Sequence, residues 1–273
     1  MYKQIWNECH ASICSINFYN NAGFKTLSNT GFKIDDFIVT DDFFLKNGSY
    51  GEVEIFFVEI DGNTRSHQVR VDFELFRSMI IQDDNNMNSQ FALIKCDFPE
   101  FHEIPSLQMS VRNQFEIGEE VAVVGFQTEE TNLSIKQGVL SSYLIKDGKK
   151  LLEFDSSLRM GNSGSPLISV GRKQVMGIVG HRLASLTRAY NNMNGIINEN
   201  LRLLKQVEGK INIQSIDPIQ VLIASQNQIK HISKEFYKSS QITNGFALDI
   251  SHVASFLEKT DYEDFEYNKS SSG

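Results

Sequence analysis

A serine flanked by glycines lies in the run Gly161-Asn162-Ser163-Gly164-Ser165-Pro166. Glycines permit a tight turn on which the backbone N–H groups of Gly161 and Ser163 point to one spot, and such convergent donors stabilise a developing oxyanion. The chemistry would be acyl transfer with Ser163 as the nucleophile. Taken alone, the same run also fits an ordinary turn. The rest of the chain has to decide between these interpretations.

Six segments, one of which contains this loop, resemble in the correct order the strands of the trypsin/chymotrypsin-like serine protease family. Among its members, they resemble the protease domain of bacterial high-temperature-requirement proteases. The segments are 30–40, 90–95, 137–141, 154–166, 175–180 and 244–251. This resemblance implies an all-β fold of two six-stranded chymotrypsin-like β-barrels, with an inserted helical hairpin and a C-terminal helix.

The resemblance also assigns catalytic roles, and two of them fall on unsuitable residues. Ser163 takes the nucleophile position, and the N–H groups of Gly161 and Ser163 form the oxyanion hole. The position of the catalytic histidine is occupied by Phe43, and that of its orienting aspartate by Gln90. Loss of the histidine from a comparable triad lowers turnover on the order of a millionfold. The sequence therefore predicts a peptidase without its base.

Other residues near the predicted cleft are weaker candidates for a base. Only one of the six histidines, His181, lies on a segment expected beside the cleft, where it contacts a bound peptide or, as the less favoured alternative, approaches Ser163. Asp41 and Asp42 are close to Phe43 in sequence, and we expect them to be solvated carboxylates of a turn.

The resemblance further suggests residues of the substrate cleft, namely Ser157, Gly180 and His181. A small neutral residue at Ser157, at the base of the primary pocket, argues against a requirement for lysine or arginine in the substrate. Alternatively the pocket is a relic, or is filled by Arg159 or Met160. In proteases activated by cleavage, the position of Asn162 is an aspartate that binds the new amino terminus, so no such activation is expected.

Composition limits the remaining function classes. The chain has 273 residues with 41% hydrophobic and 22% charged residues, which is typical of a globular protein. Its net charge, 26 minus 34 or −8, argues against nucleic-acid binding, which needs a basic surface. We expect no metal or other cofactor and no membrane association. The lack of a signal-like start and the three cysteines, an odd number, favour the cytoplasm.

Between the barrel segments and the closing strand, apolar residues recur at spacings of three and four, which predicts two amphipathic helices. Asp217-Pro218 supplies a cap and a first-turn proline for the second helix. The predicted domains are 1–182 with 244–260 as the double barrel, 183–243 as the helical insertion and 261–273 as an acidic tail. The apolar stripes pack on each other or on the barrel, or form a docking arm for a partner protein or for self-association.

These observations lead to one main interpretation and two alternatives. The first is a catalytically inactive pseudoprotease that binds a protein or peptide, in a regulatory role and in a bacterial defence or stress system of the kind that such domains accompany. The second is an active serine endopeptidase that uses Ser163 with a non-standard base. The third is an assembly scaffold that oligomerises through 183–243.

Overall fold

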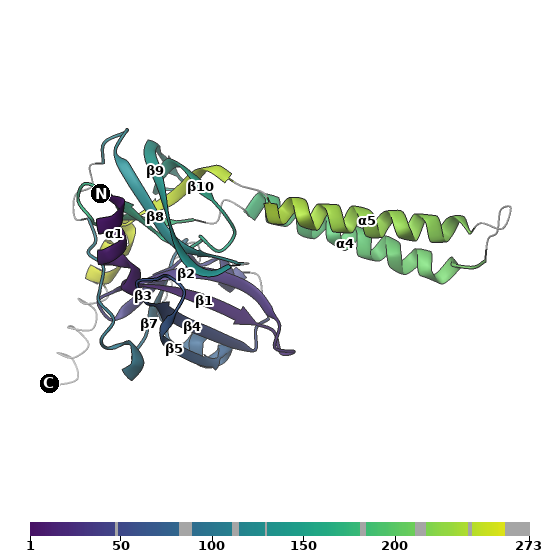
Figure 1. The fold of residues 1–273 in the computed structure, drawn as a ribbon, viewed down its shortest axis with the longest axis horizontal. Coiled ribbons are helices and arrows are strands. Elements are labelled where there is room, and N and C mark those ends of the chain that lie inside the picture. Colours follow the sequence, from purple (N-terminus) through teal and green to yellow (C-terminus); the bar gives the residue numbers. More distant parts are fainter. Residues whose placement is uncertain are drawn as a thin grey trace. The chain divides into compact units, whose positions relative to one another are not determined.

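The computed structural model describes residues 1–46, 49–81, 89–110, 115–128, 130–180, 184–210, 217–239 and 242–259. The chain divides into two compact units, drawn in Figure 1. The first unit comprises Met1–His181 together with Ile242–Gly273, and the second comprises Arg182–Gln241. The predicted tail, 261–273, lies outside the described residues.

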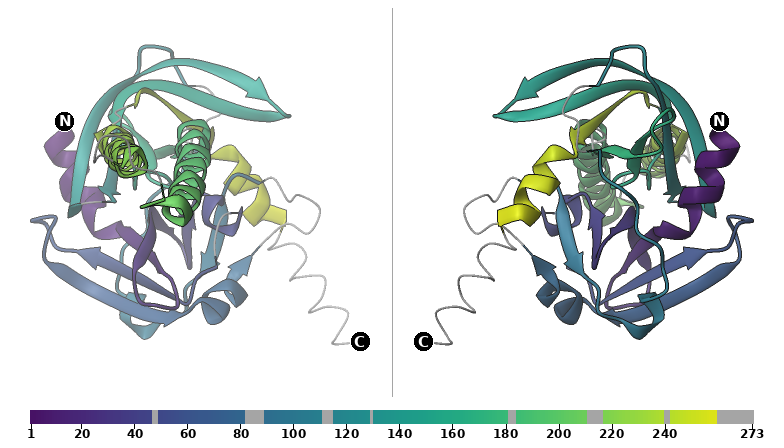
Figure 2. Two further views of the ribbon diagram at one scale, coloured as in Figure 1. Left: turned by 90° about the vertical axis from the view of Figure 1, so that its right-hand side faces the viewer. Right: turned by 90° about the vertical axis from the view of Figure 1, so that its left-hand side faces the viewer.

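The first half of unit 1 forms an antiparallel seven-stranded sheet in the order β5-β4-β1-β2-β3-β7-β6. Its strands are β1 (Ile13–Tyr19), β2 (Lys25–Ile34), β3 (Phe37–Thr40), β4 (Glu52–Val58), β5 (Arg65–Asp72), β6 (Ile80–Ile81) and β7 (Ala92–Lys95). Short helices accompany them: α1 (Tyr2–Cys9), η1 (His10–Ser12), α2 (Phe43–Lys46), α3 (Phe73–Ser78) and η2 (Pro99–Phe101). Helix α1 contacts β8 and β9 of the second half (Figure 2).

The second half of unit 1 forms a closed six-stranded barrel in the order β10-β13-β12-β11-β8-β9. Its strands are β8 (Glu120–Gln127), β9 (Glu130–Lys146), β10 (Lys149–Leu158), β11 (Pro166–Ser169), β12 (Val175–Val179) and β13 (Ile242–Asp249). Strand β13 closes the barrel by pairing with both β10 and β12, although 62 residues separate it from β12 in the chain. Residues 251–259 then form a helix.

This arrangement agrees with the predicted chymotrypsin-like double barrel and its C-terminal helix. One difference concerns the first half, where the described residues form seven strands in place of six. The additional strand is β6, which has two residues and pairs with β7, Ile80 opposite Ile94 and Ile81 opposite Leu93. So short a strand carries too little apolar alternation to be recognised in the sequence.

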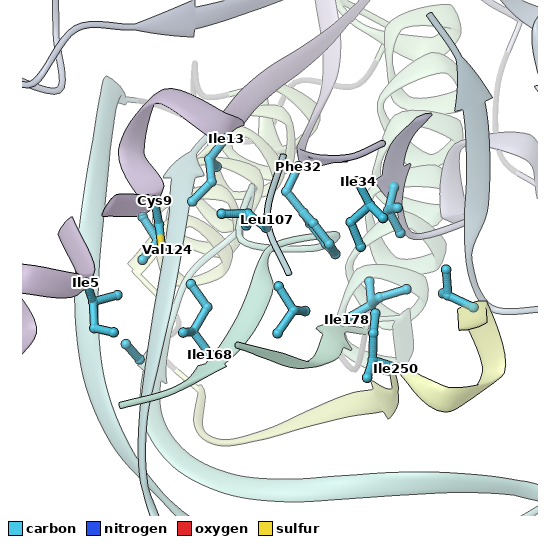
Figure 3. Packing of buried hydrophobic residues seen from close by; sticks show 14 of the residues in the cluster. Ile5, Cys9, Ile13, Phe32, Ile34, Leu107, Val124, Ile168, Ile178 and Ile250 are labelled. Carbon is cyan, nitrogen blue, oxygen red and sulfur yellow. The ribbon is translucent and has the colours of Figure 1, made fainter. Parts of the chain in front are cut away.

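The two halves of unit 1 share a hydrophobic core, shown in Figure 3. Ile13 and Phe32 come from the seven-stranded sheet, while Val124, Ile168 and Ile178 come from the barrel. All five side chains are at most 1% exposed. Full burial of an aliphatic or aromatic side chain stabilises a fold by about 1.5–3 kcal/mol, so this shared core holds the two sheets together.

A second cluster lies within the first half and fixes the chain just after β3. Phe44 is fully buried, and its ring stacks on Phe18 at 4.9 Å and meets the edge of Phe76 at 5.7 Å. Aromatic pairs at these separations stabilise beyond the area that they bury. Helix α2 is thereby anchored next to the site described below.

Unit 2 consists of α4 (Ala184–Val207) and α5 (Pro218–Ser239). The rings of Tyr190 and Tyr237 stack at 4.3 Å, nearly parallel, between the two helices. The predicted cap of the second helix is confirmed, because the Asp217 carboxylate accepts a hydrogen bond of 2.8 Å from the Ile219 N–H.

Candidate functional site

The loop that carries Ser163 lies between β10 and β11, and its conformation requires glycine at two positions. Gly161 has a φ of +95°, and a Cβ there would lie 2.6 Å from the Thr128 nitrogen. Gly164 has a φ of +82°, and a Cβ there would overlap the Thr30 carbonyl oxygen and the Thr40 hydroxyl. Only glycine satisfies both the positive φ and the lack of space.

Thr30 of β2 joins this loop to the seven-stranded sheet. Its N–H donates to the Ser163 carbonyl at 2.8 Å, and its hydroxyl donates to the Gly161 carbonyl at 2.7 Å. The Thr30 hydroxyl also accepts from the Phe126 N–H at 2.9 Å, and its carbonyl accepts from the Thr40 hydroxyl at 2.7 Å. Because Thr30 is fully buried, these bonds are shielded from competing water and hold the loop in one position.

Asn162 braces the loop from the barrel side. Its amide donates to the Phe126 carbonyl at 2.8 Å, and its side-chain oxygen accepts from the Arg159 N–H at 2.9 Å and from the Lys136 ammonium at 2.7 Å. The residue is 1% exposed. The ammonium of Lys136, on β9, therefore helps to hold the Asn162 side chain in place.

The hydroxyl of Ser163 donates a short hydrogen bond to Oδ2 of Asp41. The other oxygen of that carboxyl, Oδ1, accepts from the Asn29 amide at 2.7 Å and from the Phe43 N–H at 3.4 Å. Ser163 is 7% exposed, and Asp41 is 2% exposed. The structure thus brings together a nucleophile, a carboxyl and an amide that orients the carboxyl.

The expectation that Asp41 and Asp42 are solvated is therefore wrong, because both are buried, at 2% and 8% exposure. Asp41 has partners on β2 and on the loop after β10, and Asp42 accepts at 3.1 Å from the Gln90 N–H. These partners are distant in sequence and compensate the carboxyls for lost water. A turn sequence read locally cannot reveal them.

The environment of Asp41 favours its neutral form. Burial raises the pKa of the Asp41 carboxyl to about 7, the hydrogen bond from Ser163 opposes this rise, and the neighbouring Asp42 adds to it. The bonds from Phe43 and Asn29 lower the pKa further but do not cancel the effect of burial. At neutral pH the group therefore exchanges readily between its protonated and ionised forms.

The two residues at the predicted histidine and aspartate positions have local structural roles. Phe43 is half-buried at the start of α2, where its N–H contacts Asp41. Gln90 lies just before β7 with a φ of +67°, in the left-handed region that non-glycine residues rarely adopt. Its N–H bond to Asp42 ties this segment to the chain after β3.

The predicted cleft residues do not converge on a described pocket. Ser157 is exposed on β10, and Arg159, also exposed, bonds Gln127 at 3.2 Å. Strand β12 is paired on both sides, with β11 and β13, so it offers no open edge to a peptide up to Val179. The Gly180 N–H bonds the Phe246 carbonyl at 2.8 Å, and His181 lies outside the described residues.

Within the described part of the chain, no group of histidine, cysteine, aspartate or glutamate side chains is arranged to hold a metal ion. The three cysteines are free thiols. Burial raises the pKa of Cys9 to about 11 and that of Cys96 to about 12, and it raises the pKa of Cys14 well above its usual value. These thiols stay protonated and unreactive at neutral pH.

Sequence reasoning missed three residues of the site: Asn29, Thr30 and Lys136. Thr30 opens a segment that resembles the family, but a threonine within an alternating strand carries no sign of its inward bonds. Asn29 is the more informative case, since a buried amide in a strand must find a partner. The buried positions 28–30 are all polar, and such a run marks a strand that faces a polar site.

The chain resembles solved structures of proteases at low sequence identity. It resembles the active form of the Rv3671c protease from M. tuberculosis, at 18% identity and a TM-score of 0.49, covering 66% of this chain and 74% of that one. It also resembles the serine endoprotease from Yersinia pestis, at 18% identity and a TM-score of 0.49, covering 66% of this chain and 57% of that one. No curated protein sequence matches significantly.

None of the described helices is long and apolar enough to cross a membrane. The family model described as a trypsin-like peptidase domain matches residues 28–178, which include Asp41, Gln90 and the whole loop around Ser163. Since this match spans more than half of the sequence, the chain belongs to the trypsin-like peptidase domain family.

Proposed function

We propose that this protein is a catalytically inactive member of its family, which binds a polypeptide without turning it over. The observation that carries the proposal is the burial of the Asp41 carboxyl, which contacts Ser163. Asp41 can hold the serine proton, but at 2% exposure it has no route by which to pass that proton to a leaving amine. Peptide cleavage needs both transfers.

The groups around Asp41 support this interpretation. The family position of the histidine, which would carry the proton from one side of the cleft to the other, is taken by Phe43, and phenylalanine has no titratable group. Deacylation would also require a base that can reach a water molecule, and Asp41 lies behind Ser163, between Asn29 and the start of α2. The tight geometry of the loop, which requires glycine at 161 and 164, is then explained by binding, since backbone donors of such a loop can hold a peptide carbonyl.

The nature of the ligand follows from the charge and from the backbone after β12. The acidic chain disfavours nucleic acid as a partner. An extended peptide that adds to the backbone at Gly180, directly after β12, would use main-chain hydrogen bonds, which read no particular side chain. We place the protein in the cytoplasm, where reducing conditions keep its three free thiols unpaired.

The first experiment separates binding from turnover. A fluorophosphonate probe and a mixed peptide library are offered to the wild type and to Ser163→Ala, and we expect equal background labelling and no cleavage by either. The same library, immobilised, is used to select peptides that bind the wild type. Gly180→Leu should lose that binding. A Cβ at this position would lie 3.6 Å from its nearest neighbour, the Phe246 carbonyl oxygen, so the new side chain can be accommodated without distorting the backbone.

The control for this experiment is Gly171→Leu, at a turn where a Cβ would have nothing within 4 Å. It makes the same change away from the proposed binding position and should leave peptide binding intact. Serine-dependent cleavage at protease-like rates would overturn the proposal, and so would a library from which neither wild type nor control selects any peptide.

A second candidate function is favoured by the bond between Ser163 and Asp41. A carboxyl with a pKa of about 7, oriented by Asn29, meets the geometric requirement of a base that activates an adjacent nucleophile. An active endopeptidase that uses this pair would label with the probe at a rate that rises through pH 7, and Asp41→Asn would abolish the labelling while Asp42→Asn would not.

A further inference from the structure

Helices α4 and α5 run antiparallel, as Figure 1 shows and as their contacts require. Tyr190, Met193 and Asn198 follow one another on α4, while their partners Tyr237, Ser233 and Lys230 follow one another in reverse on α5. The helices meet through one stripe on each, whose members are buried or half-buried at heptad spacing: 190, 194, 197, 201 and 204 on α4, and 219, 223, 226, 230, 233 and 237 on α5.

A second set of large apolar side chains, all exposed, lies one residue before the contact stripe on each helix, with Val207 continuing the set beyond that stripe. Asn200 and Ser225 are polar residues at the same kind of position. The apolar side chains of the set are between 38% and 67% exposed. They are Met193, Ile196, Leu203 and Val207 on α4, and Leu222, Ile229, Ile232 and Phe236 on α5. Spacings of three, four and seven keep such residues on one side of a helix, and apolar residues repeated in this way form the seam of a coiled coil.

The two exposed stripes lie on the same face of the hairpin. One residue corresponds to a rotation of about 100° around a helix, so each exposed stripe lies about a quarter turn to one side of its contact stripe. Because the second helix runs in the opposite direction, the step to the preceding residue turns in the opposite sense when both helices are viewed from the same end. The second helix also faces the first from the opposite side, and the two reversals cancel. An offset of one residue before the contact stripe therefore lies on the same side of the hairpin in both helices.

The opposite side of the hairpin is polar. The residues that follow the contact stripe by one position are exposed, and none of them has a large apolar side chain: Gly195, Asn198, Arg202 and Lys205 on α4, and Gln220, Ala224, Asn227, His231 and Lys234 on α5. None of the eight apolar positions carries a charge. The hairpin is thus amphipathic as a whole, with an apolar face on one side and a polar face on the other.

We propose that the apolar face of unit 2 binds the same face of a second copy of this chain, so that two hairpins form a four-helix bundle. Eight side chains at the exposures given above present on the order of 700 Å² per copy, close to the roughly 800 Å² per partner of a stable interface. This area is large for two helices whose contact with each other leaves only Ile197, Ile219 and Tyr237 below 10% exposure among the described residues of unit 2.

A second copy is favoured over an unrelated partner because the face is complementary to itself. Two antiparallel hairpins with matching apolar faces are the two halves of an up-and-down four-helix bundle. A twofold axis through the face places the same residues on both sides of the contact, which is the commonest symmetry of homo-oligomers. Arg202, Lys205 and Lys234 lie on the polar face, and Lys230 lies in the contact stripe, where its ammonium bonds the Asn198 side chain at 2.7 Å. None of these four charges lies on the apolar face. The proposal does not depend on the chemistry at Ser163.

The test is the mass of the full chain in solution, measured by sedimentation and light scattering from low micromolar to ~100 µM. The wild type should be a dimer over most of this range. The double substitution of Ile196→Glu and Ile232→Glu places two carboxylates per copy on the apolar face, and should raise the dimer Kd at least ~100-fold because burying unpaired charge is costly. Both positions are more than 60% exposed, so the hairpin itself should keep its helix content by circular dichroism.

The matched control adds the same charge to the polar face by Gln220→Glu and Asn227→Glu, and it should dimerise as the wild type does. A wild-type chain that stays monomeric at the highest concentration would overturn the proposal, and would leave the face to a different protein. A dimer that is equally sensitive to both pairs of substitutions, or to neither, would also overturn it.

Discussion

At the scale of single residues, the site depends on the side chain that contacts Ser163, which is a carboxyl. The carboxyl of Asp41 occupies the place next to Ser163 where a serine nucleophile requires a base, and it reaches that place from two positions before Phe43. Asn29 holds the carboxyl from the other side. The arrangement preserves a buried hydrogen-bond chain through the loop, but its central group is a carboxyl, and its ionisation is opposed by burial.

The pKa of Asp41 leads to a prediction about stability. The carboxyl titrates near 3.8 when unfolded and at about 7 when folded, so the folded state retains its proton and is destabilised as the pH rises between these values. Asp41→Asn removes the titration and keeps the shape. We expect the free energy of unfolding of Asp41→Asn, measured in urea, to rise relative to that of the wild type by roughly 2–3 kcal/mol from pH 5 to pH 8.

The control for this measurement is Asp155→Asn, which neutralises an exposed carboxylate on β10 and should show no such growth. If the two proteins with aspartate and asparagine at position 41 keep a constant difference in unfolding free energy across the pH range, Asp41 is ionised in the folded protein throughout, and the predicted effect of its burial is wrong.

At the scale of elements, the loop around Ser163 is held by side chains from three separate strands. Thr30 of β2 binds its backbone at two points, Thr40 at the end of β3 supports Thr30, and Lys136 of β9 binds the side chain of Asn162. The loop therefore has its form before any ligand arrives. This fits a binding site that is prepared in advance, because ordering a loop on binding costs affinity.

Lys136 gives the prediction at this scale. A hydrogen bond to a charged group contributes about 1.5–3 kcal/mol, and Lys136→Met removes the bond while keeping most of the apolar stem. We expect a loss of stability of about 1–2 kcal/mol, since Asn162 retains its bonds to Arg159 and Phe126. Hydrogen exchange should quicken in the loop at 161–164 more than in β12.

The same substitution at Lys146, an exposed lysine at the end of the same strand, provides the comparison and should be nearly neutral. Equal effects at the two positions would mean that Lys136 contributes only through general surface charge.

At the scale of the whole molecule, two compact units share one chain in a nested order. Unit 2 is inserted between β12 and β13, two strands that pair directly with each other in the barrel. The Gly180 N–H bonds the Phe246 carbonyl at 2.8 Å, so the barrel brings the two ends of the insertion together. The barrel needs a connection here, but a short one is sufficient.

This leads to a prediction about removal of unit 2. Replacing residues 182–241 by a flexible linker of about six residues should leave unit 1 folded, with a urea midpoint near that of the full chain, because hairpin connections of this length are common. The shortened protein should also be monomeric at concentrations where the full chain dimerises. A protein that no longer folds would show that unit 2 is required for the barrel, whereas a folded dimer would place the self-association in unit 1.

The sequence by itself determined the family, the order of the strands and the loop that carries Ser163, because these depend on glycine and on local alternation. It also determined the two helices, through their spacing and the cap at Asp217. Only the tertiary structure decided which group contacts Ser163, since Asp41 and Asn29 lie more than a hundred residues before the loop in the chain and meet it only when the two sheets pack. The common side of the two exposed stripes was likewise decided by the antiparallel pairing of the helices, because a periodic pattern fixes a face of one helix but not its direction relative to another.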